Sequence, residues 1–497
     1  MKKTEINLVP DTLNTTPDYY CTWQTQLYAT CDGKPEGQRA IIDENSLFNE
    51  EKPYGWAYFY EDARRDLILV MDDSWDVPVN SDKEYFGSLV LNGEKFPEAV
   101  NNAENNTAAL KNLTDRILSL GWKGLGGWVC AQKAPLFHGE TTDEEYWSER
   151  LTAANDAGFS YWKVDWGGQC SSVDFRRMLT LLGRKYAPRL TIEHAMKAQI
   201  IPYCDVFRTY DVPAIMSIPM TMQKLSDILP FTPKAEGENM GLINCEDEAY
   251  IAAAGGFAMG IMRHPYSGDF MNGKKDMSFP DVHRNLKTKM CEVTRAVRWH
   301  RIAPAFGADN ENVQVSEITL TDNWIFENKE NELEDWWLEH PFTKDDIKDG
   351  GFIKSAPSAI SRSCNLPEIE PDEKGDIPYC VAAKNPNGAF SLVTLGRTRG
   401  RDYHIPLCNV AVQTGKSKII GVFGEYRNLT LKTELEGIDR IFIQDLAGDT
   451  AYDVSGQVEI SGDKVIIPGE LIKEIGTECQ PNADTSEPGV VIRLENK

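Results

Sequence analysis

A lysine and an aspartate stand two residues apart in the segment Tyr161-Trp-Lys-Val-Asp-Trp-Gly-Gly168. The apolar run predicts a short strand that ends at two glycines. Alternate residues of a strand point the same way, so Lys163 and Asp165 share one face. A buried cation beside a carboxylate keeps the carboxylate ionised. Such a carboxylate at a strand end can act as a nucleophile, as in covalent glycoside hydrolysis. By itself, the segment fits a structural ion pair better.

Further polar and aromatic residues stand at the ends of predicted strands. They are Trp23, Asp72, Asp73, Trp128, Glu193, Arg208, Asp211 and Asp247. Each has a structural interpretation: adjacent aspartates often cap a loop or helix, the arginine could pair with a nearby aspartate, and the tryptophans could be core. Together they indicate more, because isolated buried charges are costly. Carboxylates and aromatic faces that converge suit a neutral polyol with many hydroxyl groups.

The elements that would position these residues alternate along the chain. Apolar runs predict eight strands, at residues 20–25, 66–71, 124–129, 160–165, 190–193, 206–210, 240–244 and 258–262. Between most of them, apolar residues recur every three or four positions, as in residues 108–118, 146–154 and 175–182, which predicts helices. This alternation predicts an α/β fold, a parallel (β/α)8 TIM barrel whose site lies at the carboxyl ends of the strands.

The pattern changes after residue 305. Residues 306–375 are acidic and rich in loop-forming residues, and from about residue 376 short apolar runs alternate with turns such as Asn385-Pro-Asn-Gly388. This predicts a C-terminal antiparallel β-sandwich. We therefore expect a catalytic barrel at residues 1–305, an irregular connecting segment at 306–375 and the sandwich at 376–497. Trp336 and Trp337 in the connecting segment could bind a leaving group or anchor the segment to the barrel.

Composition and charge exclude several classes of function. The net charge of -24 argues against nucleic acid and anionic membranes as partners, since phosphate binding needs a basic patch. No run is long and apolar enough to span a membrane. Eleven cysteines without a CxxC motif indicate reduced thiols and a cytoplasmic location. The scattered histidines predict no metal site, and no GxGxxG follows a strand, so we expect no cofactor. The oligomeric state stays open, a homo-oligomer included.

The order of these motifs resembles the retaining α-galactosidases of glycoside hydrolase family 27 and the related family 36. Met71-Asp-Asp-Ser-Trp75 is similar to the family's motif after strand 2, and Lys163-Val-Asp165 is similar to its Lys-x-Asp. The resemblance implies Asp165 as nucleophile and Asp211 as acid/base. It also implies that sugar hydroxyls are bound by Asp72, Asp73, Lys163, Glu193 and Arg208, with Trp23 as the strand-1 tryptophan.

The chain departs from the family pattern at three places. Arg208 and Asp211 are one residue closer together than usual, which makes Asp205 a rival acid/base. Trp166 and Gly167 follow the nucleophile where many members have a cysteine, and the segment around Asp247 differs from the usual Asp-Pro-Asp. These departures indicate a divergent member.

The expected activity is removal of terminal α-D-galactose from an oligosaccharide or glycoconjugate by double displacement. The resemblance implies that N-acetylgalactosaminide enzymes carry small residues at the place of Glu193, so a glutamate there leaves little room for an acetamido group and favours a sugar with a free 2-hydroxyl. The alternatives are a β-L-arabinopyranosidase, an α-N-acetylgalactosaminidase, a galactosyl-transferring enzyme and an inactive sugar-binding protein.

Overall fold

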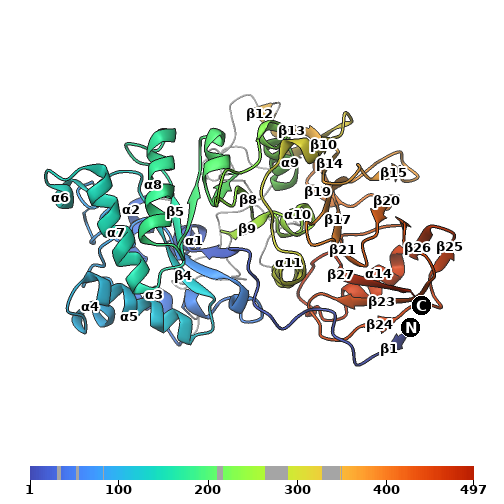
Figure 1. The fold of residues 1–497 in the computed structure, drawn as a ribbon, viewed down its shortest axis with the longest axis horizontal. Coiled ribbons are helices and arrows are strands. Elements are labelled where there is room, and N and C mark those ends of the chain that lie inside the picture. Colours follow the sequence, from blue (N-terminus) through green and yellow to red (C-terminus); the bar gives the residue numbers. More distant parts are fainter. Residues whose placement is uncertain are drawn as a thin grey trace.

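A computed structural model describes residues 1–30, 35–51, 55–81, 83–209, 216–262, 289–326, 347–348 and 350–496. The chain forms a barrel surrounded by helices and a group of β-sheets beside it (Figure 1). Asp211 and the pair Trp336 and Trp337 lie outside the described residues.

Eight parallel strands close into the barrel. They are β2 (Tyr19–Cys21), β3 (Ile68–Met71), β4 (Gly124–Val129), β5 (Tyr161–Val164), β6 (Thr191–His194), β7 (Val206–Arg208), β8 (Leu242–Glu246) and β9 (Ala258–Ile261). Each strand pairs with the next along the chain, and β9 returns to β2 where Gly260 lies beside Tyr19. The prediction of an eight-stranded parallel barrel is confirmed. Nearly all strand residues are buried, which explains why the strands are continuous apolar runs.

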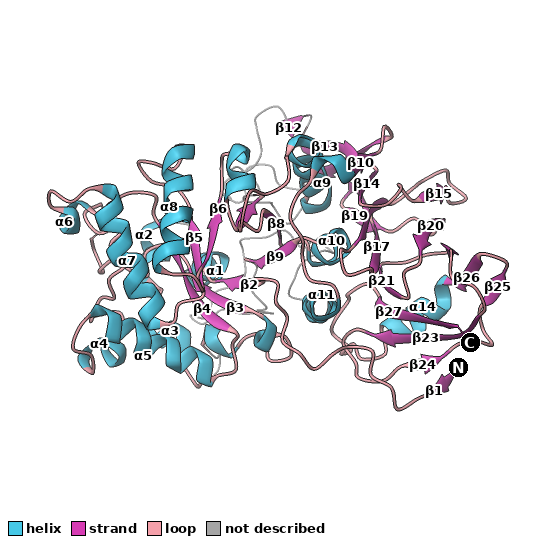
Figure 2. Cartoon of the chain, viewed as in Figure 1, coloured by secondary structure: helices cyan, strands magenta, loops and turns pink. Residues whose placement is uncertain are grey.

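Helices follow most barrel strands and cover the barrel (Figure 2). The longer ones are α1 (Trp23–Thr30), α5 (Asn106–Ser119), α7 (Asp143–Ala157), α8 (Val173–Tyr186), α9 (Ser217–Ile228), α10 (Ala249–Gly255) and α11 (Met290–Ile302). Shorter ones are α2 (Pro35–Ala40), α3 (Glu44–Phe48), α4 (Pro97–Asn101) and α6 (Pro135–His138). Local sequence sets their ends: in α7, Thr142 and Glu145 form a capping box, and Gly158 ends the helix with a left-handed φ of 78°.

The first predicted strand extends too far. Strand β2 ends at Cys21, and Trp23 is already the first residue of α1. The Gln26 amide donates to the Thr22 carbonyl at 2.8 Å, which is the first helical hydrogen bond. An apolar run of six residues does not distinguish a strand from a strand followed by a helical turn.

Three sheets form the C-terminal part. Their strands, apart from those described below, are β16 (Tyr379–Lys384), β17 (Phe390–Leu395), β18 (Arg397–Gly400), β19 (Asp402–His404), β20 (Asn409–Gly415), β21 (Ile419–Phe423), β22 (Asn428–Thr433), β23 (Ile438–Asp445), β24 (Tyr452–Asp453), β25 (Glu459–Ser461), β26 (Lys464–Pro468) and β27 (Gly489–Asn496), with one helix, α14 (Gly469–Gly476). A nine-stranded and a five-stranded sheet enclose an apolar core between them. This confirms the predicted sandwich. Most strand pairs are antiparallel, but β17–β21 and β20–β22 are parallel, and so are β14–β16 and β11–β18, whose first strands are described below.

The description of residues 306–375 as irregular does not hold where the structure describes them. They contain β10 (Val313–Val315), β11 (Thr319–Ile325), β12 (Ile347–Lys348), β13 (Gly351–Pro357), β14 (Ala359–Arg362) and β15 (Glu368–Glu370). Strand β11 was missed because Asp322 stands among its inward residues and breaks the apolar alternation. Asp322 is buried there and accepts from Arg397 Nε at 2.6 Å. The three-part division of the chain stays a prediction.

The nine-stranded sheet is buried on both faces. On β16, Cys380 and Ala382 face the sandwich core, whereas Tyr379 and Val381 join the core shared with the barrel. Helices α10 and α11 cover that second face, and the rings of Tyr250 and Phe423 lie 4.8 Å apart across the boundary. The barrel and the nine-stranded sheet thus share an apolar core, which is separate from the core inside the sandwich.

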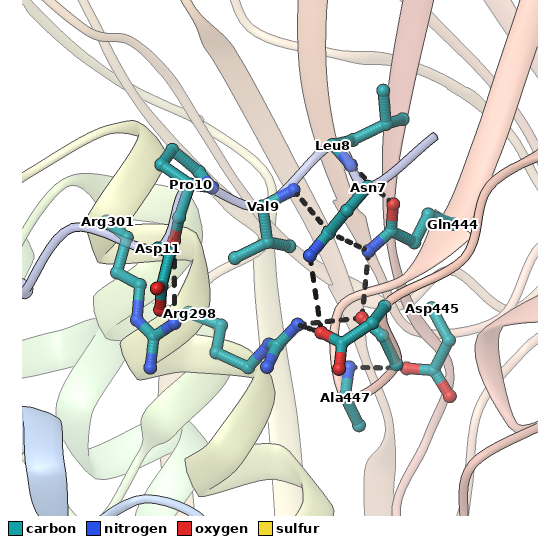
Figure 3. Close-up of polar contacts among 12 residues, drawn as sticks. Asn7, Leu8, Val9, Pro10, Asp11, Arg298, Arg301, Gln444, Asp445 and Ala447 are labelled. Atoms are coloured by element: carbon teal, nitrogen blue, oxygen red, sulfur yellow. Dashed lines mark hydrogen bonds and ion pairs between the residues drawn. The ribbon is translucent and has the colours of Figure 1, made fainter. Parts of the chain in front are cut away.

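The N-terminal segment belongs with the sheets rather than with the barrel. Strand β1 (Lys2–Lys3) pairs with β24 at the edge of the nine-stranded sheet. The Leu8 amide donates to Gln444 Oε1 at 2.6 Å, and Gln444 Nε2 donates to Asn7 Oδ1 at 2.7 Å (Figure 3). The chain therefore starts on the C-terminal part and crosses to the barrel before β2.

Candidate active site

The candidate site begins with a buried cation at the centre of the barrel. Lys163, on β5, places Nζ 2.5 Å from Asp72 Oδ2, just beyond the end of β3. The Cys21 thiol, on β2, donates to the same carboxylate oxygen at 2.8 Å. Strand β4 separates β3 from β5, so the long lysine side chain crosses the barrel interior to reach Asp72. Lys163 and Asp72 therefore tie two strand ends together.

Asp165 lies one step beyond the end of β5 and faces the same interior. The Trp128 indole Nε1, on β4, donates to Asp165 Oδ2 at 3.1 Å, and Arg208 Nη2, on β7, lies 3.1 Å from Asp165 Oδ1. Burial alone would raise the pKa of Asp165, but the charges of Arg208 and Lys163 and the indole hydrogen bond outweigh it and lower the pKa. Asp165 is thus held ionised. Its side chain is 10% exposed, compared with 1% for Lys163 and for Arg208.

Glu193, on β6, forms an ion pair with Arg208. Its Oε1 lies 3.4 Å from Arg208 Nε and accepts from the Tyr19 hydroxyl at 3.3 Å. Its Oε2 accepts from Tyr161 at 2.8 Å and from Asn244 at 2.7 Å. A carboxylate has about four acceptor positions, so protein groups fill this one. Burial raises the pKa of Glu193. The arrangement fixes the Arg208 guanidinium between two carboxylates, with Asp165 on the open side.

Asp73 forms a second carboxylate at the end of β3. Its Oδ1 accepts from the Ser74 hydroxyl at 2.7 Å, and Arg39 Nε lies 3.4 Å from its Oδ2. Burial raises the pKa of Asp73 to about 7 although Arg39 opposes the shift. The environments of Asp165 and Asp73 therefore shift the two pKa values in opposite directions.

Aromatic rings form one wall beside Asp165. The Trp128 and Trp166 ring centroids are 5.4 Å apart, and Phe86 lies 4.9 Å from Trp166. The Arg39 guanidinium lies 5.0 Å from the Phe86 ring. Trp23 is partly exposed and packs on the apolar residues inside the barrel. Trp128 and Phe86 are buried, so Trp166 is the ring of this wall that is partly exposed.

Asp247 lies at the end of β8 in a strained conformation. Its φ is 56°, in the left-handed region, and its Oδ1 accepts from the Met262 amide beyond β9 at 2.8 Å. Such outliers are frequent at functional sites. Asp247 therefore fixes two neighbouring strand ends at the barrel opening.

Asp205 lies away from these residues. It precedes β7 and therefore stands at the amino end of the strand, about 10 Å along the chain from Arg208. It contacts Arg184 of α8 and accepts from the Ile192 amide at 2.9 Å. These contacts make it a structural residue at the opposite end of the barrel, which removes it as a rival to Asp211.

Several residues around Asp165 were not singled out from the sequence. They are Tyr19, Cys21, Arg39, Phe86, Tyr161, Arg176 and Asn244. Tyr161, Lys163 and Asp165 stand at every second position and therefore lie on the same face of one strand. The tyrosine could thus have been found by the same argument as Asp165. The others come from distant segments and carry no local signal.

The sequence matches no family model and no curated protein. A search of solved structures gives matches at low identity. Two are Bacteroides fragilis proteins provisionally assigned as alpha-galactosidases: one has 11% identity and a TM-score of 0.41 over 99% of this chain and 81% of its own. The other has 10% identity and a TM-score of 0.37 over 99% and 80%. An alpha-amylase from Geobacillus thermoleovorans has 9% identity and a TM-score of 0.41 over 98% and 100%. Likeness at this level carries no information on activity.

Two properties of the described residues bear on ligands and membranes. No group of three or more His, Cys, Asp or Glu side chains in the described ranges is arranged to hold a metal ion. None of the helices described is both long and apolar enough to cross a bilayer.

Proposed function

We propose that this protein is a retaining exo-glycosidase that removes terminal α-D-galactose from oligosaccharides or glycoconjugates. The observation that carries the proposal is the environment of Asp165. This carboxylate is kept ionised by Arg208 and Lys163, is oriented by the Trp128 indole, and stays partly exposed at the carboxyl ends of the barrel strands. A covalent glycosidase requires such a nucleophile.

The reaction would proceed by two displacements. Asp165 attacks the anomeric carbon, the bond to the leaving oxygen breaks, and Asp211 gives its proton to that oxygen. Asp211 then takes a proton from water, the water oxygen attacks the anomeric carbon, and Asp165 is released. The role of Asp211 rests on the family resemblance.

The binding roles follow from the contacts of each group. Asp72, Asp73 and Asp247 supply acceptors for sugar hydroxyls, with Lys163 as a donor, while the partly exposed Trp23 provides apolar surface. Trp128, which was expected to bind the sugar as well, is buried and orients Asp165 instead. Glu193 acts through Arg208 in this proposal, because its oxygens are already bonded to protein donors. This revises the expectation that Glu193 contacts the sugar.

Azide rescue tests the nucleophile directly. The Asp165→Gly variant should lose hydrolysis of 4-nitrophenyl α-D-galactoside, and sodium azide should restore turnover with β-galactosyl azide as the product. Undiminished hydrolysis by this variant would refute the assignment.

A panel of 4-nitrophenyl α-glycosides tests the sugar. We expect the galactoside to be cleaved fastest. Faster cleavage of the N-acetylgalactosaminide, or of the β-L-arabinopyranoside in a matched assay, would assign the site to that sugar instead.

A further inference from the structure

Arg176 lies behind the strand that carries Asp165. It belongs to the first turn of α8, is fully buried, and uses all three nitrogen groups of its guanidinium. Nη1 donates to the Val164 carbonyl at 3.0 Å, Nη2 to the Asp165 carbonyl at 3.0 Å, and Nε to the Cys170 carbonyl at 2.8 Å. One side chain thus binds the backbone on both sides of the loop that follows β5.

The front of the same loop is fixed by the neighbouring strand end. The Ala131 amide donates to the Trp166 carbonyl at 2.7 Å, and the Gln169 amide donates to the Ala131 carbonyl at 2.8 Å. Gly167 has a φ of 137°, and a Cβ there would lie 2.8 Å from the Ala131 backbone, so only glycine fits this close approach. The loop is therefore held between Ala131 in front and Arg176 behind.

Arg176 has an unusual charge environment. Among the described residues no carboxylate forms an ion pair with it, and its remaining side-chain neighbour is the neutral ring of His194, 3.2 Å from Nη1. Burial lowers the pKa of His194, which keeps that ring neutral. An unpaired buried cation is costly. A planar fork that binds consecutive carbonyls is the feature that a lysine or an apolar residue could not supply.

We infer that Arg176 is a positioning residue for Asp165: its fork fixes the Val164 and Asp165 carbonyls so that the Asp165 carboxylate stays against Trp128 and Arg208, and its charge adds to the positive surroundings of the nucleophile. The inference rests on the proposed function for its link to catalysis. The part of the inference that concerns the loop after β5, which Arg176 anchors, rests on the observed hydrogen bonds alone.

Among the described residues, the charged and titratable groups that surround Asp165 come from six elements. They are Lys163 on β5, Arg208 on β7, Arg176 on α8, Asp72 and Asp73 after β3, Glu193 on β6 and Cys130 after β4. Of the three cations, Lys163 contacts Asp72, and Arg208 lies between Asp165 and Glu193. Arg176 is the cation whose charge no described carboxylate offsets by contact.

The test compares Arg176→Met and Arg176→Lys with Arg177→Met, a control that removes the same charge one residue along the helix on its exposed side. With 4-nitrophenyl α-D-galactoside, we expect Arg176→Met to lower kcat by about 100-fold with little change in KM, because a small displacement of a reacting group costs about that much. Its acidic limb of kcat/KM should move to higher pH, since loss of a cation raises the pKa of Asp165.

The lysine variant separates charge from geometry. Arg176→Lys keeps the positive charge but cannot hold all three carbonyls, so kcat should fall while the acidic limb stays in place. This variant also guards against misfolding of Arg176→Met. Wild-type kcat and an unmoved acidic limb in both variants would overturn the inference.

Amide hydrogen exchange tests the anchor without reference to activity. In Arg176→Met, exchange should become faster within residues 164–170 and stay unchanged elsewhere, whereas Arg177→Met should match the wild type throughout. Faster exchange over the whole barrel, or none at the loop, would overturn the anchor. If the wild type cleaves no glycoside, the proposed function fails, and the exchange comparison still decides whether Arg176 holds the loop.

Discussion

Two buried aspartates with arginine partners lie in different regions of this protein and are held differently. Asp445, at the boundary between the barrel and the sheets, receives two hydrogen bonds from Arg295, at 2.8 and 3.1 Å, and one each from the Ala447 and Cys479 amides. Asp165, at the barrel opening, receives one hydrogen bond from Trp128 and one charge contact from Arg208.

The exposed fraction of each side chain follows the same division. It is 1% for Asp445 and 10% for Asp165. A carboxylate that only joins two parts of the chain can have every acceptor position filled. One that attacks a carbon atom must keep a lone pair directed at the substrate. The comparison indicates that Asp445 contributes to stability, whereas the surroundings of Asp165 suit the nucleophile that we propose it to be.

The largest effect should follow replacement of the accessible aspartate. Asp165→Asn should lower kcat on the order of 10⁴-fold or more, as expected for a residue that forms the covalent intermediate. The melting temperature should fall slightly, because the lowered pKa of Asp165 means that its charge stabilises the folded state through Arg208 and Lys163. Asp174→Asn, the same change at an exposed position on α8, is the control for both measurements. A large loss of stability with retained activity would reverse the comparison.

At the boundary between the barrel and the sheets, we expect a loss of stability without a loss of activity. Asp445→Asn should lower the free energy of unfolding by about 3–5 kcal/mol, because it leaves the buried Arg295 without its charge partner. Urea denaturation measures this, with Asp439→Asn on the exposed part of β23 as the control. The folded variant should keep its kcat. A kcat reduced to the level of Asp165→Asn would show that the boundary also controls the site.

Because Arg39 offsets only part of the effect of burial, the buried carboxylate of Asp73 should destabilise the folded state when it is ionised. Its folded pKa is raised to about 7, so the folded state binds more protons than the unfolded state between about pH 4 and pH 7, and stability falls as pH rises through that range. Asp73→Asn should therefore be more stable than the wild type at pH 8, by up to about 4 kcal/mol. The difference should vanish below about pH 4. An equal difference at all pH values would contradict this origin.

The smallest effect is expected for Glu193, which pairs with Arg208. Glu193→Gln removes a negative charge next to Arg208, which should lower the pKa of Asp165 further and move the acidic limb of kcat/KM to lower pH. At neutral pH we expect a change of about 10-fold or less, within the range of one lost hydrogen bond to a charged group. A raised KM with an unmoved limb would instead place Glu193 in contact with the sugar.

Much of the barrel could be predicted because its signals are local. Each strand is an apolar run, and helix ends carry capping residues such as Thr142 and Gly158. Strand β11 was missed because the buried Asp322 finds its partner, Arg397, 75 residues further along the chain. The N-terminal strand was missed for a related reason, since two lysines carry no pattern and only the edge of the nine-stranded sheet makes them a strand.

The site divides in the same way. The sequence by itself determined that Lys163 and Asp165 share a face at a strand end, because the period of a β-strand is fixed by its backbone. Only the tertiary structure decided that Glu193 pairs with Arg208, that Asp205 stands at the opposite end of the barrel, and that Arg176 lies behind Asp165. The reason is physical: hydrogen bonds and ion pairs depend on a distance in space, and barrel closure brings together residues that the chain keeps far apart.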